Sequence, residues 1–467
     1  MIIGTLSVLN RKRRNIGHIL ATVLLLLAMC VTQVQADPDV ANPARKSGKY
    51  VFAHYMVCFC PPDGTGDAVA DYKREILSAQ QHGVDGFALN CGAWNAKPES
   101  SYYKMRVLSM YEAAKQLGTD FKLFLSADYA GALSLDETRD MIETFRNHPN
   151  QFRHQGKPVL STWDGGQKQA DFIKNEFQGD RAIVFVPCFL PRRNVDNPGQ
   201  SELDQFFKDY PYIDGYFYFG AAQYTKNLVE STMLHAQRWH DAGKIFMASA
   251  TPFYRGLGMN YRVFERQGFE GMAAQWEAAI KCDADWLEIT TWNDWNELTY
   301  VAPIGSQEHL KNIANICGPL LSHDGYLDAS RYYIDWFKTG VAPAITQDQI
   351  FYFYRLHPKK LEGINKPGYK GTDHPTGWKA LEDDVYVTTF LTAPAKLTIY
   401  TGGTSQSFDL PAGVHHVRLP FAAGSQRFVL QRDSTTLIDK SGEHEISATD
   451  AWGNFNYFAG SAQVRSR

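Results

Sequence analysis

The sequence has no block of charge of one sign. Its 467 residues include 47 basic and 50 acidic side chains, for a formal net charge of −3, and the two signs are interspersed along the chain. Nucleic acids and anionic membranes are usually bound by concentrated basic patches. The charge pattern therefore argues against both partners and favours a neutral substrate.

The sequence also lacks two familiar ligand motifs. No Gly-x-Gly-x-x-Gly follows the first expected strand, so the usual nucleotide-binding fingerprint is missing. Cys58 and Cys60 form a Cys-x-Cys pair, but no histidine stands at ligand spacing beside them. We therefore expect neither a metal site nor a cofactor.

A long apolar run occurs only near the N-terminus. Basic residues Arg11–Arg14 precede the apolar run Ile19–Val31, and Val34–Ala36 ends in a small residue before an acidic one. This order is typical of a cleaved secretory signal over residues 1–36, which predicts a secreted or periplasmic protein. A lipoprotein modified at Cys30 and a retained membrane anchor are the alternatives, but the residue before Cys30 is not small and the run is short for a membrane span.

Cysteine is scarce, with seven in the chain. Removal of the signal would leave an even six, and export would permit disulfides. The pairing does not follow from a sequence alone. We expect that Cys58 or Cys60 pairs with Cys91. The second expected pair is Cys282 with Cys317.

The chain does contain a regular alternation of short apolar runs and longer amphipathic stretches. Helices are expected between the runs, for example over 68–82, 101–117 and 227–242, each followed by a glycine that favours a helix C-terminus. Apolar strands that alternate with helices indicate parallel strands covered on both faces. Eight of them fit a (β/α)8 TIM barrel, and a doubly wound open sheet is the competitor. The runs are YVFAHYM (50–56), VDGFALN (84–90), FKLFLSA (121–127), KPVLSTW (157–163), AIVFVPC (182–188), IDGYFYF (213–219), KIFMASA (244–250) and WLEITTW (286–292).

The pattern changes towards the C-terminus. From Val385 onward, short alternating strands are separated by Gly, Pro and Asp turns, which is typical of an antiparallel β-sandwich. A chain of this length also exceeds the usual size of a single core. We therefore divide it into a signal peptide at 1–36, a catalytic barrel at 37–345, and a linker with the C-terminal sandwich at 346–467.

The stretch WLEITTWNDWNELTY, from Trp286 to Tyr300, places a strand directly before two carboxylates three residues apart, Asp294 and Glu297. Tryptophan rings and amide groups surround them. A sugar needs this mixture, since a pyranose has C–H faces and a hydroxyl rim. The alternative is a capping box, in which Asp294 begins a helix and Glu297 is its N3 partner. Capping requires no tryptophan, so the three in this stretch favour a sugar site.

Polar or aromatic residues also stand at the ends of most other runs. In a barrel, active residues gather at the C-terminal ends of the strands. Each residue taken alone has a structural explanation, such as a turn, a loop contact or a core histidine. The expected third carboxylate is Asp128. The candidate substrate-binding residues are His54, Tyr55, Asn90, Trp163, Tyr218, Trp292, Asn293 and Tyr300.

Six motifs occur in order between about residue 50 and residue 359. They are VFAHYMV, YKREILSAQQHGVDGFALN, FKLFLSADY, GKPVLSTW, TWNDWNE and FYRLHPK. Together they resemble glycoside hydrolase family 71, whose members are α-1,3-glucanases, also called mutanases. The resemblance implies that Asp294 and Glu297 are the catalytic pair, that Asp128 supports them, and that the anomeric carbon is inverted. The segment CFCPPDGTGDAV departs from the fungal members, and the basic signal is of a bacterial type.

An inverting glycosidase uses one carboxylic acid to protonate the glycosidic oxygen and one carboxylate to activate water on the opposite face. Packing against an aromatic ring would raise the pKa of Glu297 and suit it as the acid, leaving Asp294 as the base, and the opposite assignment stays open. Two other functions stay open, a non-catalytic glycan-binding barrel and an endo-α-mannosidase-like hydrolase. We expect a monomer acting on a neutral α-glucan, with no nucleic acid partner and no membrane partner after signal cleavage.

Overall fold

The computed structural model describes the chain in segments with gaps between them. They are residues 44–59, 61, 64–95, 102–189, 199–305, 310–361, 374–449 and 453–464. The expected signal at 1–36 lies outside these segments. The described residues from Arg45 onward form one compact unit. None of the helices in these segments combines the length and the apolar character required to cross a bilayer.

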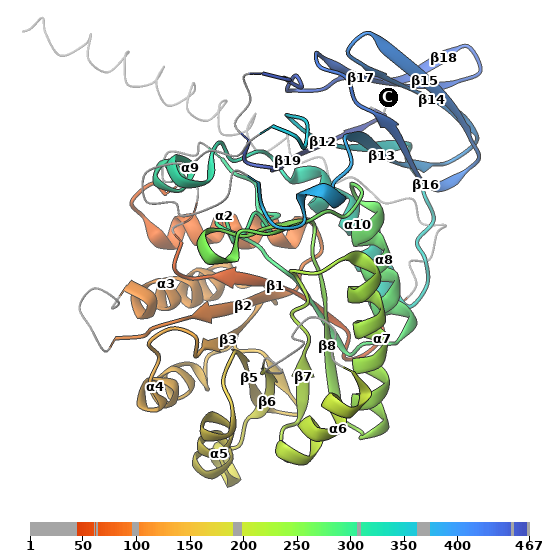
Figure 1. The fold of residues 1–467 in the computed structure, drawn as a ribbon. Coiled ribbons are helices and arrows are strands. Elements are labelled where there is room, and N and C mark those ends of the chain that lie inside the picture. The colour runs from red at the N-terminus through yellow and green to blue at the C-terminus, as the bar shows by residue number, and fades with distance from the viewer. Residues whose placement is uncertain are drawn as a thin grey trace, which may run out of the picture. The chain divides into compact units, whose positions relative to one another are not determined.

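Eight parallel strands form a curled sheet in the first part of the chain (Figure 1). Their order is β6-β5-β3-β2-β1-β11-β8-β7, and the short antiparallel β4 pairs with β5. Each of the eight apolar runs in the sequence overlaps one of these strands, and β1 and β5 have the bounds expected. The eight strands are β1 (Tyr50–Met56), β2 (Gly86–Cys91), β3 (Lys122–Asp128), β5 (Lys157–Trp163), β6 (Val184–Cys188), β7 (Gly215–Phe217), β8 (Ile245–Ala250) and β11 (Trp286–Ile289). Three shorter strands are β4 (Arg153–His154), β9 (Tyr254–Arg255) and β10 (Val263–Phe264).

The two outer strands of this order, β6 and β7, are not joined by a ladder in the described residues. Two hydrogen bonds nevertheless connect them. The Asp214 N–H donates to the Phe185 carbonyl at 3.0 Å, and the Phe185 N–H donates to the Asp214 carboxylate at 2.8 Å. The curl of the sheet therefore brings its first and last strands next to each other.

The side chains of the parallel strands divide into two layers, because successive residues of a strand point to opposite faces. Phe52 of β1, Phe124 of β3 and Trp286 of β11 gather around Phe152 in an inner cluster. The Phe152 ring lies 4.8 Å from Phe52 and 5.0 Å from Trp286. Alternate residues such as Tyr55 belong to the larger outer cluster, which includes the helices. The inside of the curl is thus filled by aromatic side chains.

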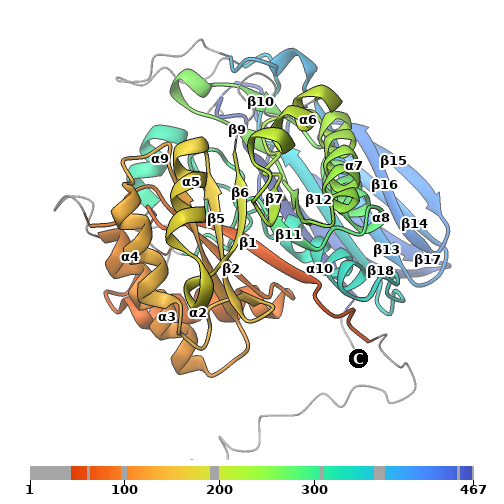
Figure 2. The ribbon, with the colours of Figure 1, turned by 90° about the horizontal axis from the view of Figure 1, so that it is seen from below.

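Helices cover the outer face of the curled sheet (Figure 1), and α7 and α8 lie side by side (Figure 2). The three glycines expected to end helices, Gly83, Gly118 and Gly243, have φ values of 84°, 64° and 67°, which only glycine adopts readily. The expected helix ends are therefore confirmed. The helices are α2 (Ala68–Gln81), α3 (Tyr102–Leu117), α4 (Leu135–Phe145), α5 (Gln167–Glu176), α6 (Gln200–Asp209), α7 (Thr225–Asp241), α8 (Glu270–Lys281), α9 (Lys311–Cys317) and α10 (Asp324–Thr339).

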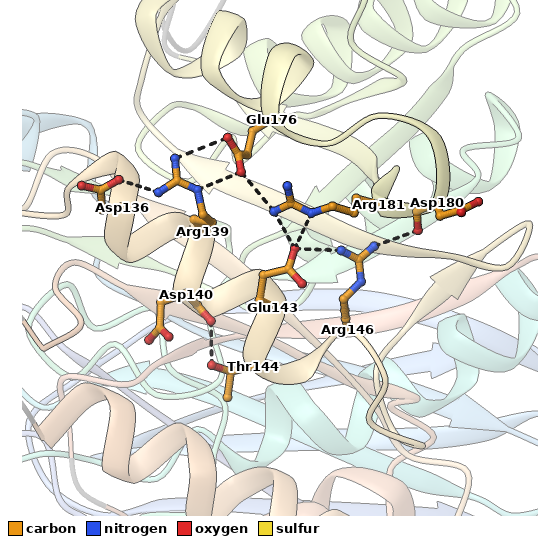
Figure 3. A network of polar contacts seen from close by, with 9 residues as sticks. All are labelled: Asp136, Arg139, Asp140, Glu143, Thr144, Arg146, Glu176, Asp180 and Arg181. Atoms are coloured by element: carbon orange, nitrogen blue, oxygen red, sulfur yellow. Dashed lines mark hydrogen bonds and ion pairs between the residues drawn. The ribbon is translucent and has the colours of Figure 1, made fainter.

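A network of charged side chains joins α4 to α5 (Figure 3). Glu176 pairs with Arg139 at 2.9 Å and with Arg181 at 3.0 Å. Glu143 pairs with Arg181 at 2.9 Å and with Arg146 at 2.8 Å. Water screens such exposed pairs, so each contributes little alone. Because each carboxylate binds two arginines, the network fixes the spacing of the two helices that follow β3 and β5.

Two four-stranded antiparallel sheets form the C-terminal part, with the orders β16-β13-β12-β19 and β15-β14-β17-β18. Tyr352 and Val387 of the first sheet share one apolar cluster with Leu397 and Phe428 of the second, so the two sheets pack face to face. The strands are β12 (Gln349–Arg355), β13 (Asp384–Leu391), β14 (Ala395–Thr401), β15 (Thr404–Leu410), β16 (Gly413–Pro420), β17 (Gln426–Arg432), β18 (Thr435–Ser441) and β19 (Tyr457–Gln463).

The sheet that contains β12 is apolar on its other face as well. Phe351 and Phe353 belong to the same core cluster as the helices of the parallel sheet. The Phe353 ring lies 4.7 Å from Tyr326 of α10 and 6.3 Å from Phe269 before α8. Helix α10 contacts α8 as well as β12 and β19. One continuous core therefore joins the parallel sheet to the C-terminal sheets.

We predict that a chain ending at residue 345 is insoluble, or much less stable than the full chain. The truncation would uncover Tyr326 and the rest of the α10 face that packs on β12 and β19. Exposed apolar surface of this kind favours aggregation. Soluble yield and the midpoint of thermal unfolding check the prediction. A soluble and equally stable truncated chain would show that the sandwich is an independent module.

Candidate active site

The loop after β11 is fixed at the carboxyl edge of the parallel sheet. Asn293 binds the end of β1 in both directions, since its Oδ1 accepts from the Met56 N–H at 2.7 Å and its Nδ2 donates to the Met56 carbonyl at 3.2 Å. The Asp294 N–H donates to the Thr291 hydroxyl at 2.8 Å. These bonds hold Asp294 and Glu297 beside the ends of two neighbouring strands, β1 and β11.

The contacts of this loop do not make a capping box. Asp294 Oδ1 accepts hydrogen bonds from the N–H groups of Asn296 at 3.1 Å and Glu297 at 3.0 Å, as a helix cap would. However, residues 295–298 form a turn and not a helix, and the Asp294 N–H binds Thr291 rather than the Glu297 side chain. The capping-box alternative is therefore wrong, and the Glu297 carboxylate is directed elsewhere.

Glu297 is held by the β9–β10 hairpin, which follows β8. Its Oε1 accepts hydrogen bonds from the Tyr254 hydroxyl at 2.8 Å and from Asn260 Nδ2 at 3.1 Å. Arg262 Nε donates to Asn260 Oδ1 at 2.6 Å, which places a guanidinium next to this group. Burial raises the pKa of Glu297, while the bonds from Tyr254 and Asn260 and the charge of Arg262 oppose the rise. The net effect is a raised pKa, but these three residues stabilise the carboxylate form of Glu297 against the effect of burial.

Asp294 has fewer partners that stabilise its charge. Its side chain is almost completely buried, and burial together with the negative charge of Glu297 raises the pKa of Asp294 to about 8. Only the two backbone N–H groups of Asn296 and Glu297 oppose this rise. A general acid and a general base are usually two carboxyl groups whose different environments keep one protonated and the other ionised.

The third carboxylate, Asp128, ends β3, which β1 and β2 separate from β11 in the sheet. It accepts hydrogen bonds from the Ala130 N–H at 3.0 Å and from the Asn90 side chain, and these bonds oppose the rise in its pKa that burial causes. The charges of both Asp294 and Asp128 reach the Cys58 thiol, where with burial they raise the thiol pKa to about 12. Asp294 and Asp128 therefore both lie close to Cys58 at one edge of the sheet.

A buried histidine and glutamate lie on the inner face of the sheet near this edge. His54 Nδ1 is 2.9 Å from Glu288 Oε2, and both side chains are enclosed. The His54 ring lies 5.2 Å from Phe219, which in turn lies 4.4 Å from Trp163. His54 and Trp163, both candidates from the sequence, are thus brought together through Phe219.

The rings expected to form a sugar platform after β11 are buried instead. The Trp292 Nε1–H donates to Glu75 of α2 at 2.9 Å, and the ring packs 5.1 Å from Phe87. The Tyr300 hydroxyl donates to the Leu321 carbonyl at 2.5 Å. Both rings are 0% exposed. The loop turns back into the outer layer, so its large rings complete the core while its carboxylates stay at the edge.

Two further candidates face the helices and not the carboxylates. Tyr55 packs 6.3 Å from Tyr72 of α2, and Tyr218 packs 4.9 Å from His235 of α7. Because neighbours on a strand point to opposite faces, Tyr55 is on the helix side when His54 is on the inner side. The candidates that the structure does bring to the carboxyl edge are Asp294, Glu297, Asp128, Asn90, Asn293, His54 and Trp163.

Sequence reasoning missed three residues of the site. Tyr254, Asn260 and Arg262 come from the hairpin that follows β8, and all three surround Glu297. The available signal was the segment TPFYRGLGMNYR directly after a strand, because loops at the carboxyl ends of parallel strands carry most active-site residues.

The expected disulfides are not formed between the described cysteines. Cys58, Cys91, Cys282 and Cys317 are free, so both pairings that use only these residues are wrong, and Cys60 lies outside the described segments. Cys282 follows α8 and precedes the start of β11, whereas Cys317 lies near Asn296, beyond the other end of that strand. In the described parts of the chain, no cluster of His, Cys, Asp and Glu has a geometry that would hold a metal ion.

Two fungal relatives are similar over almost the whole chain. A mutanase of Penicillium rubens is 27% identical over 454 residues, which covers 94% of this chain and 94% of the relative. The glucan endo-1,3-alpha-glucosidase agn1 of Schizosaccharomyces pombe is 27% identical over 430 residues, which covers 88% of this chain and 94% of the relative.

One solved structure is similar at a lower level. A GH99 endo-alpha-mannosidase from Bacteroides thetaiotaomicron is 17% identical with a TM-score of 0.47, covering 62% of this chain and 98% of its own, and a likeness of this size supports no conclusion about activity. The model of glycosyl hydrolase family 71 matches residues 47–467, from before β1 to the end of the chain. The chain therefore belongs to glycosyl hydrolase family 71.

Proposed function

We propose that this protein hydrolyses the α-1,3-glucosidic bonds of a neutral polysaccharide. Membership of family 71 and the relatives named mutanase and glucan endo-1,3-alpha-glucosidase point to this substrate. The observation that carries the proposal is the pair Asp294 and Glu297, two buried carboxyl groups of one loop in unequal surroundings. Export to the periplasm or the medium rests on the pattern of residues 1–36, which is of a bacterial type.

In this proposal Asp294 is the general acid and Glu297 the general base. Asp294 stays protonated near neutral pH because its pKa is raised to about 8. Tyr254, Asn260 and Arg262 favour the carboxylate form of Glu297. Asp294 then gives its proton to the glycosidic oxygen while Glu297 takes a proton from the attacking water, which inverts the anomeric carbon. This assignment reverses the one that the sequence favours, because the rings expected to desolvate Glu297 pack elsewhere.

Asp128 and Asn90 support the pair from across the edge. They are hydrogen-bonded to each other, and the charge of Asp128 acts on the Cys58 thiol, as the charge of Asp294 does. From this place Asp128 binds a sugar hydroxyl at the cleavage point or orients the water. His54 and Trp163 lie on the inner face nearby and are proposed to contact the same sugar.

We also propose that the curled sheet is a closed (β/α)8 barrel. The eight parallel strands and the hydrogen bonds between Phe185 and Asp214, which link β6 to the start of β7, support closure. In such a barrel the ends of β3 and β11 face each other across the opening, which suits a substrate held between Asp128 and Asp294.

The substrate proposal is tested by the release of reducing sugar from insoluble α-1,3-glucan, α-mannan and β-glucan, measured side by side. We expect release from the α-1,3-glucan alone. Release from α-mannan alone would favour the endo-α-mannosidase-like alternative. Tight binding of the α-1,3-glucan without any release would favour a glycan-binding protein.

We predict that the first product detected by proton NMR is the β-anomer, because inversion of an α-linkage gives a β-product. Asp128→Asn should lower turnover strongly and leave this configuration unchanged, since Asp128 does not take part in the bond changes. The measurement follows the anomeric proton signals within the first minutes of hydrolysis. An α-anomer that appears first would require a covalent intermediate, and one of the three carboxylates would then be its nucleophile.

A further inference from the structure

An aromatic cleft lies beside the hairpin that holds Glu297. It has a volume of about 680 Å³ and is lined by Tyr224 and by residues 374–380, a segment that precedes β13. None of these residues takes part in the proposed acid and base chemistry. The cleft is therefore separate from the proposed acid and base.

The cleft presents aromatic faces to solvent. Tyr224 is 44% exposed, and its ring is held edge-on by Phe264 of β10 at 5.1 Å. Trp378 is half-buried, and His374 stacks on its ring at 4.3 Å with an angle of 27° between the planes. Aromatic rings that are held by neighbouring side chains and are partly exposed to solvent can bind the C–H faces of a pyranose. Such contacts bury apolar area and require no charge.

Polar groups stand next to these rings. Thr376 and Lys379 are exposed within the lining of the cleft, and the Tyr224 hydroxyl lies near the backbone of Gly377. Hydroxyl, ammonium and backbone groups supply both donors and acceptors for sugar hydroxyls. Lys379 is the one lysine or arginine of the lining, and the lining has no carboxylate.

Backbone hydrogen bonds attach residues 374–380 to the β9–β10 hairpin, which holds Glu297. The Val263 N–H donates to the Thr376 carbonyl at 2.9 Å, and the Thr376 N–H donates to the Tyr261 carbonyl at 2.9 Å. Gly377 has φ of 94°, and a Cβ on it would lie 2.7 Å from the Val263 carbonyl oxygen, so only glycine permits this approach. The segment is thus built to lie against the hairpin.

The hairpin connects the cleft to the catalytic base. The Phe264 ring lies 6.0 Å from Tyr254 and 5.1 Å from Tyr224. Tyr254 donates its hydroxyl proton to Glu297, and Tyr224 opens onto the cleft. Three adjoining rings of the hairpin region therefore connect Glu297 to the cleft.

We infer that this cleft is a distal glycosyl subsite, in which Tyr224 and Trp378 bind units of the same α-glucan chain beyond the cleavage point. The inference rests on the proposed function. It gives residues 374–380, which belong to the C-terminal part of the chain, a role in binding long substrates. Short substrates that end before the cleft would not use it.

The test compares kcat/KM on insoluble α-1,3-glucan with kcat/KM on the shortest α-1,3-gluco-oligosaccharide that the wild-type protein cleaves. Tyr224→Ala and Trp378→Ala should each lower kcat/KM on the polymer by about tenfold more than on the oligosaccharide, the loss of one good aromatic contact. The change should appear in KM rather than in kcat. Tyr400→Ala, which removes a ring that is 37% exposed on β14, is the matched control and should alter neither value.

Thermal unfolding of each variant separates lost binding from lost folding, and Trp378→Phe provides a milder second variant that keeps an aromatic face. Equal losses on both substrates, or no loss on the polymer, would overturn the distal subsite while the proposed function stands. A wild-type protein that cleaves no α-1,3-glucan at all would overturn the proposed function, and the subsite with it.

Discussion

Glu297→Gln and Asp294→Asn are each expected to lower turnover at least about a hundredfold, since acid or base assistance contributes on the order of 10² to 10⁴. Both changes remove a titrating group and keep the shape of the side chain. Asparagine at 294 retains the oxygen that accepts from Asn296 and from the residue-297 N–H, and glutamine at 297 retains the acceptor for Tyr254. The loop should therefore keep its position.

Steady-state rates on α-1,3-glucan and thermal unfolding midpoints check this expectation together. Glu230→Gln is a suitable control, because Glu230 is 55% exposed on α7 and pairs only loosely with Lys226, at 3.8 Å. It should leave rate and midpoint unchanged. If either active-site variant loses its fold while the remaining folded protein keeps full turnover, the carboxylate has a structural role only.

The parallel strands could be located from the sequence because their signal is local. A run such as KPVLSTW carries no charge after its first residue, as a strand buried at its five central residues requires, and β5 has the bounds expected from it. The same holds for helix ends at glycines such as Gly83, whose φ of 84° disfavours any other residue. The two candidate carboxylates could be singled out because a strand directly precedes them in the chain.

The direction in which the aromatic side chains point could not be predicted from the local sequence. Trp292 and Tyr300 stand in the same loop as Asp294, yet their rings enter the core because the loop folds back towards α2 and Leu321. That path depends on the distant partner Glu75, which the local sequence does not reveal. The Tyr254 and Asn260 contacts to Glu297 were missed for the same reason, since the hairpin is about forty residues earlier in the chain.

The second large effect expected is on pH dependence, where kcat/KM should fall as the pH rises through about 8. Asp294 must be protonated to act as the acid, and burial with the Glu297 charge raises its pKa to about 8. Above that pH each further unit lowers the protonated fraction about tenfold, and kcat/KM follows it. The pKa of Glu297 is also raised, so the loss of activity at low pH should begin above the ordinary range of a glutamate. Initial rates over a series of overlapping buffers measure the decline of kcat/KM at low pH and at high pH. Because the two carboxyl groups interact, the two apparent pKa values belong to the pair and not to either residue alone.

A substrate with a leaving group that needs no proton distinguishes the acid from the base. An α-1,3-oligoglucosyl fluoride is such a substrate, because fluoride departs without general acid assistance. Asp294→Asn should recover most of its turnover on the fluoride and lose the decline above pH 8, since the group that titrates there is gone. Glu297→Gln should stay inactive, because the attacking water still requires a base, and Tyr254 and Asn260 would then hold a neutral amide. Recovery by Glu297→Gln instead of Asp294→Asn would reverse the assignment, and it would mean that the donors around Glu297 orient a carboxylic acid rather than stabilise a carboxylate.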